Sequence, residues 1–98
     1  MSVAEKRDGT ALTIVLEGRL VTTEAMEYEA NLKTLLAGVE ELTFDLAKLE
    51  HITSAWLRVL LTAQKIMNRQ GTMKVIHVND LILEIFETAG FDNVLTVE

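Results

Sequence analysis

Apolar and polar residues alternate in two stretches of the chain, which predicts strands with one face turned toward a core. In residues 10–18 one face carries Leu12, Ile14 and Leu16. In residues 41–49 the corresponding face carries Leu42, Phe44 and Leu46. Asp8 and Gly9, ahead of the first stretch, form a dipeptide typical of hairpin turns. We therefore expect residues 2–7 to form a short partner strand.

Three further segments follow the period of a helix. They run from Thr22 or Thr23 to about residue 37, from residue 54 to 70, and from residue 80 to 89. The apolar faces expected for them comprise Ala25, Met26, Leu32, Leu35 and Leu36; Leu57, Leu60, Leu61, Ile66 and Met67; and Leu81, Ile82, Ile85, Phe86 and Ala89.

Cap residues and glycines mark the ends of these helices. We expect a threonine to cap the first helix and Asn79 to cap the third. Gly38, Gly71 and Gly90 follow the three segments and are expected to end them. For Gly71 the expectation is a left-handed backbone conformation, which glycine adopts readily.

The order of these elements indicates an α/β fold. Residues 73–78 predict a third core strand, in which His77 would lie, and residues 93–98 a final short strand. A strand–helix–strand unit from Leu42 to Val78 is typical of parallel pairing. The alternation predicts a sheet with one buried and one less covered face. Because nothing marks a linker, we expect a single domain over residues 1–98.

Composition narrows the classes of function. The chain has 98 residues, no cysteine and a net charge of −6. Such a charge repels nucleic acid, and no Lys/Arg cluster is evident along the sequence that would reverse it locally. No apolar run is long enough to cross a bilayer, and residues 1–10 do not resemble a signal peptide. We therefore expect a soluble, cytoplasmic protein that neither binds nucleic acid nor inserts into a membrane.

The chemistry available along the chain disfavours an enzyme. His51 and His77 do not have the spacing of a helical metal-binding pair. Motifs for phosphate cradles or activated serine nucleophiles are absent from the sequence. Glu40 and Glu41 are expected to form a solvated turn. The sequence thus predicts no cofactor, no metal and no catalytic residue.

The hydroxyl groups of Thr53-Ser54-Ala55, where a predicted strand leads into the second helix, have two interpretations. The simpler one is that Thr53 or Ser54 caps the following helix through its hydroxyl group. The functional one is that Ser54 is exposed at a helix N-terminus and available for phosphorylation. A phosphate there would meet unpaired N–H groups and a favourable helix dipole.

The sequence also resembles a known family over nearly its whole length. The stretches that carry the resemblance are "LEGRLVTTEA", "LTFDLAKLEHITSAWLRVLLTAQK", "GTMKVIHVND" and "IFETAGFDNVLTVE". They occur in the order seen in STAS domains of bacterial anti-sigma factor antagonists. The resemblance implies a mixed, mostly parallel sheet of four to five strands packed with three to four helices. It also implies a partner, an anti-sigma factor of the serine kinase type. Capturing this partner frees a sigma factor, and phosphorylation of one serine ends the capture.

The chain departs from the family at the switch itself. The family motif reads Asp-Ser-Ser-Gly with the second serine as acceptor, whereas this chain has Thr53-Ser54-Ala55-Trp56. Val21 stands where a further acidic residue is usual. The resemblance thus leaves Ser54 as the phosphorylation candidate. Trp56 has two alternatives, an exposed interface anchor that obstructs close approach or a side chain lying back over Thr22 and Thr23.

These observations together predict a non-catalytic binding module whose usual phosphorylation switch is altered. The residues expected to contact a partner are Val21, Thr22, Thr53, Ser54, Ala55, Trp56 and Arg58. The alternative is a STAS subunit of another assembly, a lipid-transport complex or a sensory scaffold, regulated without phosphorylation. We expect a monomer or weak dimer. The core between sheet and helices should contain Leu46, Leu57, Leu60, Leu61, Ile76 and Phe86.

Overall fold

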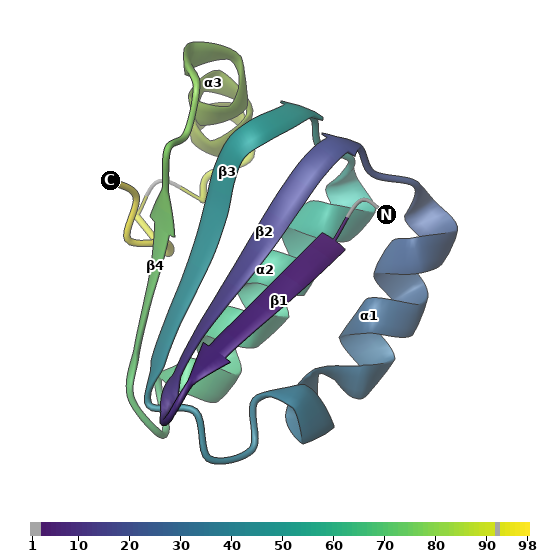
Figure 1. Ribbon diagram of the computed structural model, residues 1–98. Coiled ribbons are helices and arrows are strands. Elements are labelled where there is room, and N and C mark those ends of the chain that lie inside the picture. Colours follow the sequence, from purple (N-terminus) through teal and green to yellow (C-terminus); the bar gives the residue numbers. More distant parts are fainter. Residues whose placement is uncertain (1–2, 92) are drawn as a thin grey trace.

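The computed structural model describes residues 3–91 and 93–98. Within these residues the elements follow the order β1 (Val3–Asp8), β2 (Ala11–Arg19), α1 (Thr22–Leu35), β3 (Glu41–His51), α2 (Ser54–Met67), β4 (Thr72–Ile76) and α3 (Asp80–Thr88). The four strands form one sheet in the order β1-β2-β3-β4 (Figure 1). β1 is antiparallel to β2, whereas β2, β3 and β4 are parallel. The predicted α/β fold with a mixed, mostly parallel sheet is confirmed.

The hairpin at the start of the chain forms as predicted. Asp8 pairs with Ala11, and Gly9 lies between them with φ of +62°. This is a conformation that glycine adopts at little cost. The expected partner strand begins at Val3 in the structure, and residue 2 lies outside the described residues.

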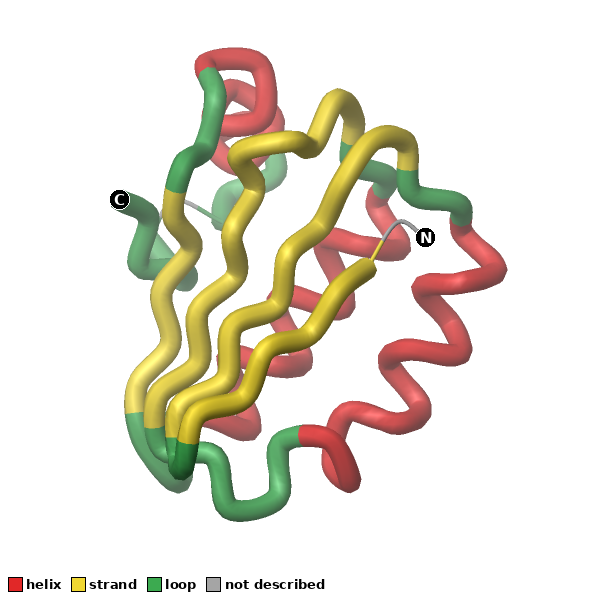
Figure 2. Tube along the Cα trace, in the orientation of Figure 1, coloured by secondary structure: helices red, strands yellow, loops and turns green. Residues whose placement is uncertain are grey.

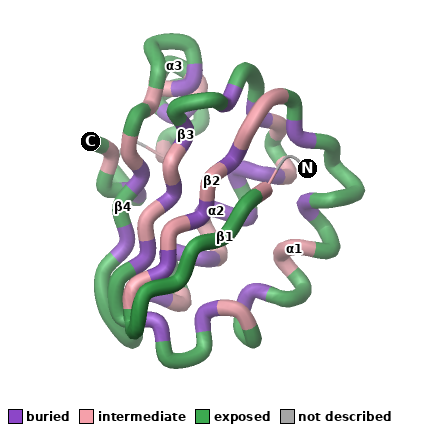
Figure 3. The backbone as a smooth tube through the Cα atoms, in the orientation of Figure 1, coloured by how far each residue is buried: buried purple, intermediate pink, exposed green. Residues whose placement is uncertain are grey.

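The helices cover one face of the sheet, as the alternation predicted. In the view of Figure 1, α2 lies behind the sheet and α1 lies to its right, whereas α3 lies beyond its upper end (Figures 1 and 2). The inward residues of β2 and β3 are buried, and their neighbours in between are partly accessible (Figure 3). Burying one side of each strand drives the helices onto this face through the hydrophobic effect.

Four of the six residues predicted for the core are buried. They are Leu46, Leu57, Leu60 and Phe86. The prediction is wrong for the other two, Leu61 and Ile76, which are only partly buried. Leu61 follows Leu60 and is therefore rotated by about 100° around the helix axis. Ile76 follows the buried Val75, and successive side chains of a strand point to opposite faces.

Two expectations about the first helix are also wrong. Val21 is the N-cap of α1 and its side chain makes no capping hydrogen bond, while Thr22 is already helical. A threonine therefore does not cap this helix. Met26, expected on the apolar face, is 68% exposed. Gly38, with φ of +78°, lies in the turn that follows the helix, as predicted.

Gly71 does not end α2 in a left-handed conformation as predicted, because the helix already ends at Met67 with Asn68 as its C-cap. Gly71 does not have a positive φ, unlike Gly9, Gly38 and Gly90. Instead, a Cβ atom at this position would lie 1.9 Å from the carbonyl oxygen of Glu40. The neighbouring Thr72 amide donates a hydrogen bond of 2.9 Å to that oxygen. Gly71 is needed because two backbone segments approach closely where β3 and β4 begin.

The last third of the chain follows the prediction in part. Asn79 caps α3, because its Oδ1 accepts a hydrogen bond of 2.8 Å from the Ile82 amide. The strand expected over residues 73–78 ends earlier, at Ile76, since His77 has φ of +59° and leaves the extended conformation. The final strand is reduced to one parallel bridge between Val75 and Val97.

Only part of the expected apolar face of α3 is buried. Ile82 and Phe86 are buried, whereas Leu81 is 55% exposed and Ala89 is exposed. None of the helices in the described part of the chain is long and apolar enough to span a membrane.

Candidate functional site

The candidate site lies where two parallel strands end. Because β2 and β3 run in the same direction, the connections that follow them lie at the same edge of the sheet (Figure 1). Val21 belongs to the first connection and Thr53 to the second. In open α/β sheets this edge is the usual place for binding residues. We call the surface formed by Val21, Thr22, Thr53, Ser54 and Ala55 the junction.

Thr53, and not Ser54, caps the start of α2. The Thr53 Oγ1 atom accepts a hydrogen bond of 3.4 Å from the Trp56 amide, and its backbone is extended. Ser54 is the first residue of the helix and is exposed. Of the two cap candidates, Thr53 is confirmed and Ser54 is not the cap. The Ser54 hydroxyl group is presented to solvent near the positive end of the helix dipole.

The junction has the character of an uncharged, exposed patch. Val21 is 52% exposed, Thr22 and Ser54 are exposed, and Thr53 and Ala55 are half-buried. None of these five side chains is ionisable at neutral pH. A partner that binds here would be held by shape, apolar contact and hydroxyl hydrogen bonds.

Trp56 lies inward from the junction and is completely buried. Its indole Nε1 donates a hydrogen bond of 3.0 Å to the carbonyl oxygen of Val21. Its ring packs against Tyr28 of α1, with ring centroids 5.5 Å apart and planes at 38°. Of the two alternatives, the inward one is therefore correct. Trp56 is not an exposed anchor.

Arg58 lies one turn along α2 from the junction, and its guanidinium is directed to α1. Its Nε is 3.3 Å from a carboxylate oxygen of Glu29. The same carboxylate accepts a hydrogen bond of 2.8 Å from the Thr62 hydroxyl group. Glu29 could not be predicted from the sequence, because the pair joins two helices and has no fixed spacing along the chain.

Among the described residues, Asp45 and Tyr28 have altered pKa values. A hydrogen bond from the Ala47 backbone amide, together with one to His77, lowers the pKa of Asp45 below its usual value. The His77 Nδ1 is 2.9 Å from the Asp45 carboxylate. Burial, and then a hydrogen bond to Glu5, raises the pKa of the Tyr28 hydroxyl. Tyr28 therefore remains neutral and donates to Glu5 at 2.5 Å.

Side chains that could hold a metal do not gather in the structure. In residues 3–91 and 93–98 no three His, Cys, Asp or Glu side chains form a group able to bind a metal ion. His51 is exposed at the end of β3, and His77 belongs to the pair with Asp45 at the end of β4. The junction itself offers two exposed hydroxyl groups, of Thr22 and Ser54, and the half-buried hydroxyl group of Thr53.

The fold and this junction define a STAS-type domain, and comparison with solved structures agrees. The anti-sigma factor antagonist SpoIIAA in its unphosphorylated form superposes with a TM-score of 0.85 at 13% identity, over 98% of this chain and 87% of that one. The phosphorylated form of Bacillus SpoIIAA gives a TM-score of 0.78 at 13% identity, over 98% and 90% of the two chains. At this identity the likeness shows the fold alone.

The sequence comparisons show the family. A family model described as "Mlab, STAS domain" matches residues 3–97, so the chain belongs to the STAS domain family. The chain is also 33% identical over 95 residues to a Bordetella bronchiseptica protein named as an anti-sigma factor antagonist, BtrV. The match covers 95% of this chain and 81% of that protein. The chain is thus an anti-sigma factor antagonist-like STAS protein, of a family whose members are generally non-catalytic regulators.

Proposed function

We propose that this protein captures an anti-sigma factor through the junction and thereby frees a sigma factor. The observation that carries the proposal is the exposed, uncharged junction at the start of α2, in a chain similar to the antagonist BtrV. Anti-sigma factors captured by STAS antagonists are serine kinases in the family that the sequence resembles. We therefore propose a partner of this kind, a cytoplasmic location and a role that involves no catalysis by this chain.

We further propose that phosphorylation does not control this capture. Ala55 stands at the position where the family has its acceptor serine, and it has no hydroxyl group. Ser54 precedes it by one residue, which on a helix is a rotation of about 100°. A kinase that aligns ATP with its acceptor tolerates displacement poorly, since ~1 Å can cost ~100-fold in rate.

Mass spectrometry after incubation with the captured kinase and ATP tests this proposal. We expect no phosphate on the natural chain and phosphate on the Ala55→Ser variant. A Ser54→Ala, Ala55→Ser double variant serves as the control, because it should be phosphorylated to the same extent as Ala55→Ser. Stoichiometric phosphate on Ser54 of the natural chain would overturn the proposal, since Ser54 would then be the acceptor.

A second candidate function is a subunit of another assembly, such as a lipid-transport complex or a sensory scaffold, regulated without phosphorylation. The observation that favours it is again Ala55, because a chain without the acceptor has no need of a kinase partner. Purification of the tagged chain from its native cytosol, followed by identification of its partners, separates the two. A kinase-like anti-sigma factor supports the first function, and a transporter ATPase supports the second.

A further inference from the structure

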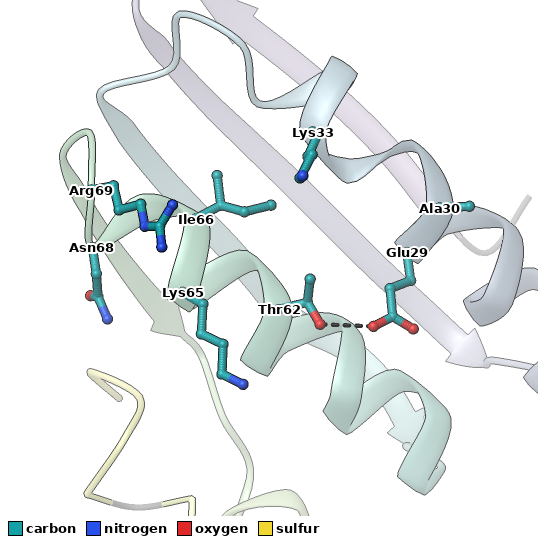
Figure 4. A pocket seen from close by; sticks show the side chains of 8 residues that line it. All are labelled: Glu29, Ala30, Lys33, Thr62, Lys65, Ile66, Asn68 and Arg69. Carbon is teal, nitrogen blue, oxygen red and sulfur yellow. Dashed lines mark hydrogen bonds between the residues drawn. The ribbon is translucent and has the colours of Figure 1, made fainter.

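A groove runs between α1 and α2 on a part of the surface that the junction does not use. Its volume is about 630 Å³. The residues that line it are Glu29, Ala30 and Lys33 from α1, with Thr62, Lys65, Ile66, Asn68 and Arg69 from α2 and the turn after it (Figure 4). Lys65 lies roughly 16 Å along the helix axis from Ser54, at ~1.5 Å per residue. The groove and the junction are therefore separate surfaces on the same pair of helices.

Three positive charges surround this groove. Lys33, Lys65 and Arg69 are all exposed, and none of them belongs to an ion pair found within the described residues. In Figure 4, Lys33 and Arg69 extend toward Ile66 from opposite sides, whereas Lys65 extends from α2 in the direction away from α1. The sequence shows no such cluster, because Lys33 lies far along the chain from Lys65 and Arg69. The cluster forms only when α1 and α2 pack together.

The single carboxylate in the groove does not cancel these charges. Glu29 already pairs with Arg58 and accepts a hydrogen bond from Thr62. The end of the groove away from the junction is therefore positive, on a chain whose net charge is −6. Such a local reversal of charge attracts acidic groups and orients them during association.

We propose that this groove binds an acidic segment of a partner protein. Carboxylates of the segment would pair with Lys33, Lys65 and Arg69, and its aliphatic side chains would contact Ala30 and Ile66. Charge complementarity favours an acidic occupant, and the distribution of the charges favours a protein segment. Lys65 and Arg69 lie about one helical turn apart, and Lys33 comes from the other helix.

A compact phosphate group fits the groove less well than an acidic segment. The helix flanks that form its walls have their backbone N–H groups engaged in intrahelical hydrogen bonds. Phosphate sites usually draw on free amides at a helix N-terminus, whereas here only flexible side chains are available. Several carboxylates spaced along a peptide match separate lysine and arginine side chains better than one phosphate does.

Nuclear magnetic resonance titration of the full chain tests the proposal. The probe is a short peptide of repeating Glu-Glu-Leu units, and its Lys-Lys-Leu counterpart is the control peptide. We expect the acidic peptide alone to shift amide resonances, with the largest shifts at residues lining the groove. The affinity should fall as ionic strength rises, because exposed charges are screened by salt.

A matched pair of double variants distinguishes binding at the groove from non-specific electrostatic attraction between the peptide and the whole chain. Lys65→Glu with Arg69→Glu should weaken binding by about tenfold or more. Lys6→Glu with Lys74→Glu makes the same change in net charge at exposed positions of β1 and β4, and should leave the affinity within about twofold of the natural chain. Urea melts of both variants would establish that each is folded.

Four results would overturn the proposal. One is no binding of the acidic peptide, or equal weakening by both double variants. Another is stronger binding at the groove by inorganic phosphate than by the peptide, which would indicate a small-anion site. The last is binding to phosphatidylglycerol vesicles that depends on Lys65 and Arg69 while the peptide does not bind, which would indicate a membrane surface.

Discussion

At the scale of single residues, Trp56 joins the start of α1 to the start of α2. Its indole donates to the carbonyl oxygen of Val21, which also accepts a hydrogen bond of 3.3 Å from the Ala25 amide. Tyr28 covers the ring from α1. Trp56 lies at a position of the family's switch motif, but its side chain is part of the core. From there it supports Val21 and Thr53.

Replacing Trp56 with phenylalanine should lower the free energy of unfolding by about 1–3 kcal/mol. The change removes the hydrogen-bond donor to Val21 and leaves a small cavity beside Tyr28. Urea denaturation measures the effect. Met26→Leu is a suitable control, since Met26 is 68% exposed and its replacement should change stability by less than about 0.5 kcal/mol. An unchanged urea midpoint for Trp56→Phe would show that the indole does not support the junction.

At the scale of elements, α2 is the helix that connects the core to both candidate surfaces. Its inner face is buried from Trp56 to Met67, its first residues form part of the junction, and its outer face forms one wall of the groove. Because α2 contributes to the core, the junction and the groove, a substitution on its buried face that destabilises the helix also affects both surfaces.

Two adjacent leucines of α2 should differ sharply in their contribution to stability. Leu60→Ala should cost about 2–5 kcal/mol, because Leu60 is completely buried and its removal leaves a cavity. Leu61→Ala should cost about 1 kcal/mol or less, since Leu61 is only partly buried. Urea melts of the two variants check this. Equal losses would mean that the inner face of α2 is assigned wrongly.

The pattern of apolar residues was sufficient to predict the main helices and strands, but not the contacts that hold them together. Residues such as Leu12 and Phe44 repeat with a fixed period, so the sheet and helices could be predicted. The close approach of Gly71 to Glu40, and the contact of Trp56 with Val21, bring together segments distant in sequence. The periodicity of apolar residues within one segment cannot indicate such contacts. The same holds for the groove, whose basic residues come from two helices.

At the scale of the whole molecule, one carboxylate links stability to pH. The pKa of Asp45 is lowered in the folded state, mainly by the Ala47 amide and then by His77. Folding therefore favours the charged form of Asp45. This contribution is fully present above the ordinary pKa of an aspartate, about 3.9, and is lost as pH falls through the lowered folded-state pKa.

Asp45→Asn should therefore flatten the dependence of stability on pH in the acid range. The difference in unfolding free energy between the natural chain and the variant should be largest above about pH 4 and should shrink at lower pH. Urea melts at a series of pH values measure it. The His77→Ala variant should retain part of this pH dependence of stability, because the Ala47 amide still donates a hydrogen bond to Asp45. A constant difference down to the lowest pH would contradict the role given to Asp45.

The position of Trp56 also gives the molecule its own optical probe. It is the only tryptophan in the chain, it is buried beneath the junction, and the only tyrosine lies against it. Excitation absorbed by Tyr28 passes to an indole so close by, and the wavelength of the indole emission depends on its exposure to water. Any event that separates α1 from α2, whether partner binding at the junction or filling of the groove, would then change the fluorescence of the unlabelled protein.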